Sequence, residues 1–410
     1  MGISKYRKYS VVAFGMAAAV LLVGTMFADW SGFVETELLP KWYVFVGASM
    51  LLTIIMACRH VIRVRGGIAM AVAWCIMAYF AMRTLSSPLE QPSIIVICIA
   101  AFVMLCLCFN AMPQRWNVIF GDIVIVVCVG QGIYGMLQYA GLISPHSTFP
   151  MVGSFDNPAG FSACLVAGFP FCLKKLPKNN RLQWGLVLCG RVVIPVAIVL
   201  SGSRGGVLSV AVVSALCLHG TNFRMRKPLM ATVIFAGSAI LLSALFFLKQ
   251  DSSFGRLQIW EVSIGMIREH LLFGGGAGSF LANYMPHQAA FFAVDSSNGW
   301  SVLADNVSHP LNEYLLILTE YGIVGLSLLL LAAFVMLRHR KWTTTQGLCL
   351  WAIGVFACFS YPLRYPFSWV IIAYAIATIN YEKHLFITLS WALRTIIICL
   401  IGKHMLSHNT

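Results

Sequence analysis

The stretch from residue 93 to residue 109 reads SIIVICIAAFVMLCLCF and contains no charged side chain. A run of this length and composition is what an α-helix needs to cross the hydrocarbon core of a bilayer. Similar apolar runs recur along nearly the whole chain, near residues 10–28, 41–58, 66–82, 93–109, 119–140, 158–174, 184–201, 205–219, 229–248, 309–337, 344–360 and 365–380. The sequence therefore predicts an all-α, polytopic integral membrane protein of about 12 transmembrane helices.

The composition of the 410-residue chain agrees with this prediction, because 59% of its residues are hydrophobic and only 10% are charged. A soluble domain carries about 25% charged residues. All 13 cysteines fall inside apolar runs and no Cys-X-X-Cys pair occurs. We interpret these cysteines as small hydrophobic side chains and predict neither a disulfide framework nor a metal site.

The distribution of charge predicts the orientation of the chain. The net charge of +14 lies in short basic clusters between apolar runs, which is typical of membrane-protein loops and argues against a nucleic acid partner. If the N-terminus is cytoplasmic, inner segments hold 18 of the 28 lysines and arginines and outer segments hold seven. Outer segments also hold ten of the 14 acidic residues. This bias favours a cytoplasmic N-terminus.

One outer segment, residues 249–308, is the only long stretch that contains many polar residues. It divides the chain into an N-terminal membrane bundle (1–248), an outer loop with short helices (249–308) and C-terminal membrane helices (309–410). A thirteenth apolar run, 385–402, contains Arg394 and is edged by Lys383 and Lys403. We expect this run to lie at the cytoplasmic interface, although a thirteenth span is the alternative.

Two arginines at the outer side are candidates for binding an anion. Arg204 lies in Ser201-Gly-Ser-Arg-Gly-Gly206, where its small neighbours Ser203 and Gly205 allow close approach. Arg256 follows Gly255 at the start of a predicted helix, and Trp260 lies one turn later on the same face. A guanidinium matches phosphate oxygens with a planar fork. The alternative for both arginines is a position at the membrane interface, where such side chains reach to headgroups.

His309 stands at the predicted start of the span 309–337, and Asn312 and Glu313 follow it. A histidine at a helix N-terminus can accept a proton or donate a hydrogen bond to a phosphate, whereas the alternative is a structural cap. Glu313 lies four residues later and is placed to orient the ring. Glu320 is an acidic residue inside a span and therefore a functional candidate, or else a partner for Arg191.

Two further motifs have mainly structural interpretations. The run Gly274-Gly-Gly-Ala-Gly278 follows a predicted helix instead of a strand, so we reject a dinucleotide-binding loop and expect the glycines to turn the chain. Asn157, before Pro158, is expected to cap the helix 158–174 at the same outer side. Because the charge count places Arg204, Arg256 and His309 on one side, the set suits a phosphate-bearing lipid substrate.

The ordered set of motifs resembles the O-antigen ligase and O-antigen polymerase family of membrane glycosyltransferases. The motifs are 153–160, 201–206, Gly255-Arg256 with Trp260, Phe273 to Phe280, and His309-Pro-Leu-Asn-Glu-Tyr-Leu315 followed by Glu320-Tyr-Gly322, and the resemblance covers about residues 150–325. It implies a GT-C-like fold in the bacterial inner membrane with a periplasmic active site. It also implies transfer of a glycan from an undecaprenyl-diphosphate carrier to a lipid A-core sugar hydroxyl, with neither a metal nor a cofactor.

The resemblance also assigns roles to residues. Arg204 and Arg256 would bind the diphosphate, and His309 would assist the acceptor hydroxyl or the leaving phosphate. The substrate-binding set would be Ser203, Gly205, Trp260, Asn157, Asn312 and Glu313. Many ligases have asparagine directly after the histidine, whereas this chain has Pro310, which leaves the acceptor class open.

Three other functions are alternatives to the ligase reaction. An O-antigen polymerase and a protein O-oligosaccharyltransferase acting on serine or threonine are alternatives within the same superfamily. A membrane transporter or flippase is an alternative from another class. It predicts charged residues deep in several spans, whereas only Arg191 is clearly deep here.

Overall fold

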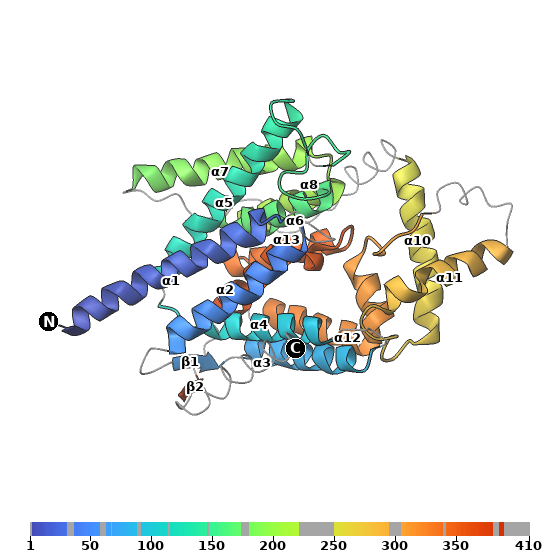
Figure 1. Ribbon diagram of the computed structural model, residues 1–410, viewed down its shortest axis with the longest axis horizontal. Helices are drawn as coiled ribbons and strands as arrows, with labels where there is room; N and C mark the ends of the chain where they lie inside the picture. Colours follow the sequence, from blue (N-terminus) through green and yellow to red (C-terminus); the bar gives the residue numbers. More distant parts are fainter. Residues whose placement is uncertain are drawn as a thin grey trace.

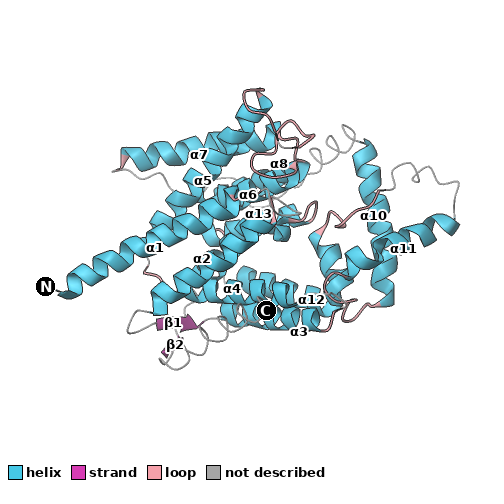
Figure 2. Ribbon diagram, viewed as in Figure 1, coloured by secondary structure: helices cyan, strands magenta, loops and turns pink. Residues whose placement is uncertain are grey.

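A computed structural model describes residues 2–30, 37–57, 63–66, 68–87, 92–113, 115–145, 147–173, 180–220, 250–294, 305–338, 342–379 and 385–388. Nearly every element in these ranges is a helix (Figure 2). The longer helices run roughly along the long axis of the molecule and form a bundle (Figure 1). The described residues thus confirm a predominantly helical, polytopic architecture.

The helices follow the predicted apolar runs closely. The first half holds α1 (Gly2–Phe27), α2 (Leu39–Ala57), α3 (Ile68–Leu85), α4 (Pro92–Asn110), α5 (Arg115–Tyr139), α6 (Pro158–Gly168) with the 3-10 helix η1 (Phe169–Leu173), α7 (Arg181–Leu200) and α8 (Arg204–Gly220). The second half holds α10 (Gln250–Glu269), α11 (Ser279–Val294), α12 (Glu313–Arg338), α13 (Thr345–Ala357), the 3-10 helix η3 (Pro362–Arg364) and α14 (Pro366–Thr378). The predicted span 229–248 lies outside the described residues.

Five described helices are long and apolar enough to cross a bilayer: Leu39–Met56, Pro92–Asn110, Trp116–Tyr139, Arg181–Leu200 and Glu313–Met336. Six further apolar helices are shorter. α13 and α14 have 13 residues each. At about 1.5 Å per residue such a helix spans about 20 Å, less than the hydrocarbon core of about 30 Å. The total of about 12 spans therefore stays a prediction.

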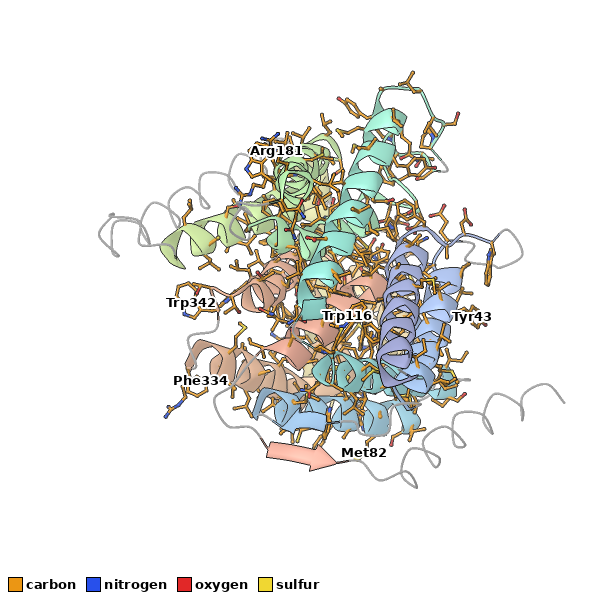
Figure 3. The ribbon with its side chains drawn as sticks, turned by 90° about the vertical axis from the view of Figure 1, so that its left-hand side faces the viewer. Tyr43, Met82, Trp116, Arg181, Phe334 and Trp342 are labelled. Atoms are coloured by element: carbon orange, nitrogen blue, oxygen red, sulfur yellow. The ribbon has the colours of Figure 1, made fainter. Side chains whose placement is uncertain are left out.

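The two ends of the bundle carry different elements. The N-terminus of α1 lies at one end, whereas α10 and α11 lie at the other (Figure 1). Seen from the N-terminal end, Arg181 at the start of α7 and Trp342 before α13 are in view (Figure 3). The charge count predicts the same separation, with a cytoplasmic N-terminus and the helices of segment 249–308 outside.

A short β-ribbon corrects the expectation of a purely helical chain. β1 (Arg63–Gly66) pairs antiparallel with β2 (Leu385–Thr388), and Arg63 lies opposite Thr388. The run Phe386-Ile-Thr388 is aromatic and β-branched, a composition that favours extended backbone. The predicted segment 385–402 therefore begins as a strand and not as a helix. Its remainder, 389–402, lies outside the described residues.

The core is centred on α6, whose residues from Gly160 to Gly168 are all buried. α6 packs against α5, α13 and α14. Gly160 permits a close contact with Tyr365, because a Cβ at this position would lie 2.6 Å from the Tyr365 ring. The cysteines of the described ranges are free thiols, mostly buried or half-buried, which agrees with their interpretation as small hydrophobic side chains.

Candidate active site

Arg204 and Arg256 meet beside the chain that leaves α13. Arg204 is the first residue of α8, and the next residue, Gly205, packs so closely that a Cβ would lie 3.1 Å from the Cβ of Phe359. Arg256, from α10, donates a hydrogen bond from Nη1 to the Phe359 carbonyl at 2.6 Å. Burial, followed by the like charge of Arg204, lowers the pKa of Arg256 to about 10. The two guanidiniums are therefore close enough to repel each other.

His309 is held by residues of the loop between α13 and α14. Arg364 contacts Nε2 of His309 through Nη1, and the same nitrogen donates to Ser308 Oγ at 3.3 Å. The ring of Tyr361 lies 4.8 Å from the imidazole, centroid to centroid. The other ring nitrogen, Nδ1, is buried and has no hydrogen-bond partner among the described residues.

Tyr361 connects the two groups of residues. Burial is the main cause that raises its pKa, and the charges of both Arg364 and Arg256 act in the opposite direction. Tyr361 therefore lies within electrostatic range of both arginines. The structure thus brings Arg204, Arg256 and His309 together with Tyr361 and Arg364, and these five residues are called the arginine cluster below.

Burial and the neighbouring Arg364 keep the His309 imidazole neutral. Burial, followed by the positive charge of Arg364, lowers the pKa of His309 to about 4. At neutral pH the imidazole is therefore uncharged and retains a lone pair. A neutral histidine beside arginines is able to accept a proton from a hydroxyl group.

The segment before α12 differs from the expected helix start. Asn312 Oδ1 accepts hydrogen bonds from the backbone N–H of Tyr314 at 3.0 Å and of Leu315 at 3.3 Å, so Asn312 is the cap and α12 begins at Glu313. Trp260 Nε1 donates to the carbonyl of Pro310 at 2.9 Å. This bond ties α10 to the segment and holds His309 in a loop, so the expectation that His309 begins the helix is wrong.

The two glutamates of α12 have other partners than expected. Glu313 is only 5% exposed, and the described contacts of the His309 ring come from Arg364 and Tyr361 instead of Glu313. Glu320 accepts a hydrogen bond from the N–H of Gly278 at 2.8 Å, whereas Arg191 donates to the Cys172 carbonyl at 2.8 Å. Both pairings proposed from sequence spacing are therefore wrong, because tertiary contacts supply nearer partners.

The glycine run does more than turn the chain. Gly274 has φ 70° and a Cβ there would lie 2.3 Å from the Glu320 carbonyl carbon, while Gly322 has φ 67° and its Cβ would lie 2.3 Å from the Leu272 carbonyl oxygen. Arg83 of α3 donates to the carbonyls of Phe273 at 3.0 Å and Gly274 at 2.7 Å. This backbone-to-backbone junction fixes α10 relative to α12, and with them the separation of Arg256 and His309.

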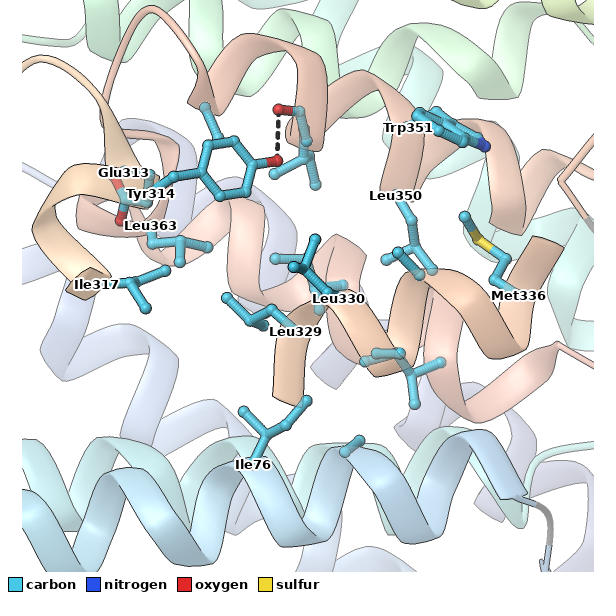
Figure 4. A pocket seen from close by; sticks show the side chains of 18 of the residues that line it. Ile76, Glu313, Tyr314, Ile317, Leu329, Leu330, Met336, Leu350, Trp351 and Leu363 are labelled. Carbon is cyan, nitrogen blue, oxygen red and sulfur yellow. Dashed lines mark hydrogen bonds between the residues drawn. The ribbon is translucent and has the colours of Figure 1, made fainter. Parts of the chain in front are cut away.

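An apolar cavity of about 380 Å³ lies between α3, α4, α12, α13 and α14. Glu313, Tyr314 and Leu363 lie at one end, and Met336 and Trp351 lie at the other (Figure 4). Tyr314 donates its hydroxyl to the Gly354 carbonyl at 2.8 Å. Because Leu363 directly precedes Arg364, the cavity ends beside the arginine cluster. No three histidine, cysteine or acidic side chains of the described residues are grouped as metal ligands.

A cluster of arginines next to an apolar cavity has the character of a site for an amphiphilic anion. Residues 187–330 match the family model for O-antigen ligase. The match confirms, for this segment, the resemblance found in the motifs. No curated protein and no solved structure matches the chain.

The matched segment contains Arg204, Arg256 and His309, and all of the expected substrate-binding residues except Asn157. Several also have structural contacts. Ser203 Oγ accepts from the Gly206 N–H at 3.3 Å and caps α8. Asn157 Oδ1 accepts from the Gly160 N–H at 2.9 Å, which confirms the expected cap, and from the Tyr365 hydroxyl at 3.2 Å. Contact of this set with a substrate stays a prediction.

Sequence reasoning missed Tyr361 and Arg364, which lie beyond the O-antigen ligase match. Arg364 counted only as one of the outer basic residues. A signal is present, because Tyr361-Pro-Leu-Arg-Tyr-Pro366 is a short turn between two apolar runs with an arginine among rigid residues. This arrangement parallels Ser201–Gly206, which carries Arg204 between two apolar runs.

Proposed function

We propose that this protein is a membrane glycosyltransferase that takes a glycan from an undecaprenyl-diphosphate carrier and transfers it to a hydroxyl group at the periplasmic face of the bacterial inner membrane. The leading acceptor is a lipid A-core sugar. One observation supports the proposal above all: the arginine cluster, with Arg204, Arg256, His309 and Arg364, adjoins an apolar cavity through Leu363, the residue before Arg364. A polyprenyl diphosphate combines the two matching properties, a doubly charged head and a long apolar tail.

The arginines suit the leaving group of such a donor. When the bond from the anomeric carbon to the diphosphate breaks, negative charge grows on the diphosphate oxygens. Fixed guanidiniums in a site shielded from water stabilise this charge in the transition state. Arg256 Nε is buried and has no hydrogen-bond partner among the described residues, so a donor remains for a ligand oxygen. In this scheme the arginines supply the positive charge, and neither a metal nor another cofactor has a role.

His309 suits the acceptor side of the reaction. Its pKa of about 4 keeps it neutral at pH 7, so it can accept the hydroxyl proton as the oxygen attacks the anomeric carbon. The protein contributes the remaining effect by holding donor and acceptor together. Trp260, Asn157, Asn312 and Glu313 surround this site and are the proposed contacts for the glycan or the acceptor.

The alternatives differ in the acceptor. An O-antigen polymerase would use the growing end of another lipid-linked glycan, and a protein O-oligosaccharyltransferase would use serine or threonine. A flippase would need a passage through the bundle with polar groups at mid-depth. The described cavity is instead almost entirely apolar, with Glu313 and Tyr314 near one end.

Deletion of the gene in its own host, followed by gel analysis of lipopolysaccharide and glycoproteins, tests the proposal. We expect loss of long lipopolysaccharide chains, restored by the wild-type gene but not by Arg204→Ala or His309→Ala. Arg268→Ala, which removes an exposed arginine of α10, is the matched control and should restore them. Single-repeat chains would instead identify a polymerase, and loss of protein glycans alone would identify a protein glycosyltransferase. An unchanged pattern in both analyses would contradict the proposal.

A further inference from the structure

The contact between Arg364 and His309 defines which ring nitrogen carries the hydrogen. A guanidinium has donors only, so Nε2 of His309 must accept the hydrogen bond from Arg364 Nη1. A neutral imidazole has one N–H and one lone pair, which places the hydrogen on Nδ1. In this arrangement, the lone pair that a general base would use accepts the hydrogen bond from Arg364.

A ligand with phosphate groups would change this arrangement. A guanidinium forms stronger, often bidentate, hydrogen bonds with phosphate than with an uncharged acceptor. Arg364 and Arg256 are both electrostatic neighbours of Tyr361. Arg364 therefore lies near the arginines that are proposed to bind the diphosphate. Nδ1–H is buried with no partner among the described residues, so a ligand oxygen would satisfy it as well.

We propose that Arg364 is a positioning residue that holds Nε2 of His309 and moves to the diphosphate when the donor binds. This inference rests on the proposed function. The move releases the base only when a donor is present. Nε2 then takes the proton of the acceptor hydroxyl as its oxygen bonds to the anomeric carbon. The bond from that carbon to the diphosphate breaks, and its electron pair leaves on the diphosphate, beside Arg204, Arg256 and Arg364.

The surroundings of His309 allow the contact to be tested by pH. Arg364 and Tyr361, from the loop after α13, contact His309 directly. Asp156 before α6 and Arg256 of α10 are electrostatic neighbours of Tyr361, and Arg204 of α8 is one of Arg256, while Glu313, in α12, follows His309. Among these, Arg364 is the charge that lowers the pKa of His309, second to burial. Removing Arg364 should therefore raise this pKa, while burial keeps it below the ordinary value of 6.5.

A spectroscopic test needs no turnover. The full-length protein in lipid nanodiscs, with ¹⁵N-labelled histidine, is titrated with farnesyl diphosphate, and a His309→Asn sample identifies the His309 signals among the ten histidines. We expect the diphosphate to shift the Nε2 signal of wild type toward that of an unoccupied lone pair. Arg364→Ala should show the shifted position without ligand. Identical spectra of wild type and Arg364→Ala without ligand would overturn the proposal.

A kinetic test separates positioning from a merely structural role. A base must be neutral, so kcat/KM falls at acid pH where the free enzyme takes up a proton. In Arg364→Ala we expect this acid limb to move upward from about pH 4, and Arg364→Lys should restore its position in part. The KM for the donor should rise about tenfold, the size expected for one lost charged hydrogen bond. Arg268→Ala is the control.

The outcomes of the kinetic test are distinct. A rate lowered equally at every pH, with the acid limb in place, would show a structural role and overturn the proposal. Full activity of His309→Asn, which can form hydrogen bonds but cannot take up a proton, would also overturn it. If no transfer occurs in the wild type, the proposed function fails, yet the imidazole spectra still decide whether a diphosphate displaces Arg364.

Discussion

Replacing Arg256 with alanine should separate activity from folding. Arg256 is proposed to give one charged hydrogen bond to the diphosphate, through the buried Nε that has no partner among the described residues. A hydrogen bond to a charged group contributes about 1.5–3 kcal/mol. At about 1.4 kcal/mol for each tenfold change, kcat/KM should fall by about 10- to 150-fold.

The same substitution should change folding stability little. The pKa of Arg256 is lowered to about 10, so below that pH the charged form is less favourable in the folded protein than in the unfolded chain. With about 1.4 kcal/mol for each pKa unit, removing this charge relieves about 3 kcal/mol. The lost bond to the Phe359 carbonyl, at 2.6 Å, offsets this by about 1.5–3 kcal/mol. The two effects nearly cancel.

The assay measures glycan transfer by the purified protein in nanodiscs at several donor concentrations, together with thermal unfolding followed by tryptophan fluorescence. Arg256→Lys keeps the charge but not the planar fork, so we expect activity between wild type and Arg256→Ala. Arg268→Ala serves as the control, because it removes an exposed arginine from the same helix. An Arg256→Ala protein with normal unfolding and kcat/KM within threefold of wild type would refute the diphosphate contact.

Three other predictions concern the frame of the site. Gly322→Ala should destabilise the protein by about 3 kcal/mol and reduce transfer, because an L-residue at φ 67° is strained and its Cβ would clash with the Leu272 carbonyl. The control Gly265→Ala, which has open space around it, should do neither, and equal melting temperatures of the two variants would contradict this prediction. Leu281→Cys, exposed on α11, should react with a membrane-impermeant thiol reagent in intact spheroplasts, whereas Arg181→Cys should react only after the membranes are permeabilised. The reverse pattern would show the opposite orientation of the chain. Ala332→Phe, in the wall of the cavity, should raise KM for an undecaprenyl-linked donor more than for a farnesyl-linked one. Equal effects on the two donors would show that the cavity does not bind the polyprenyl tail.

The sequence predicted the parts of the fold that depend on local composition. Apolar runs such as 93–109 became helices at nearly the expected bounds, because the length of a helix in a bilayer is set by hydrophobicity alone. It also placed Arg204, Arg256 and His309 on one side of the membrane, because the charge count and the order of the motifs use information from the whole chain.

Contacts between distant segments were not predictable in the same way. Arg364 meets His309 from 55 positions away, and Gly274 packs on Gly322 through backbone atoms that side-chain patterns do not report. Local spacing was misleading where tertiary partners were nearer, as for His309, which is contacted by Arg364 and Tyr361 instead of Glu313. α12 begins at Glu313, after the cap Asn312, and not at His309 for a related reason, because Trp260 holds Pro310 in the preceding loop.

Binding of undecaprenyl lipids tests directly whether Arg204 and Arg256 hold the diphosphate. The affinities of undecaprenyl diphosphate and undecaprenol are compared in nanodiscs for wild type and for the double variant Arg204→Ala/Arg256→Ala. We expect wild type to prefer the diphosphate by at least about tenfold per arginine contact, and the double variant to lose most of this preference, keeping only the contribution of Arg364, while its affinity for undecaprenol is unchanged. The same preference for the diphosphate in both proteins would contradict this expectation.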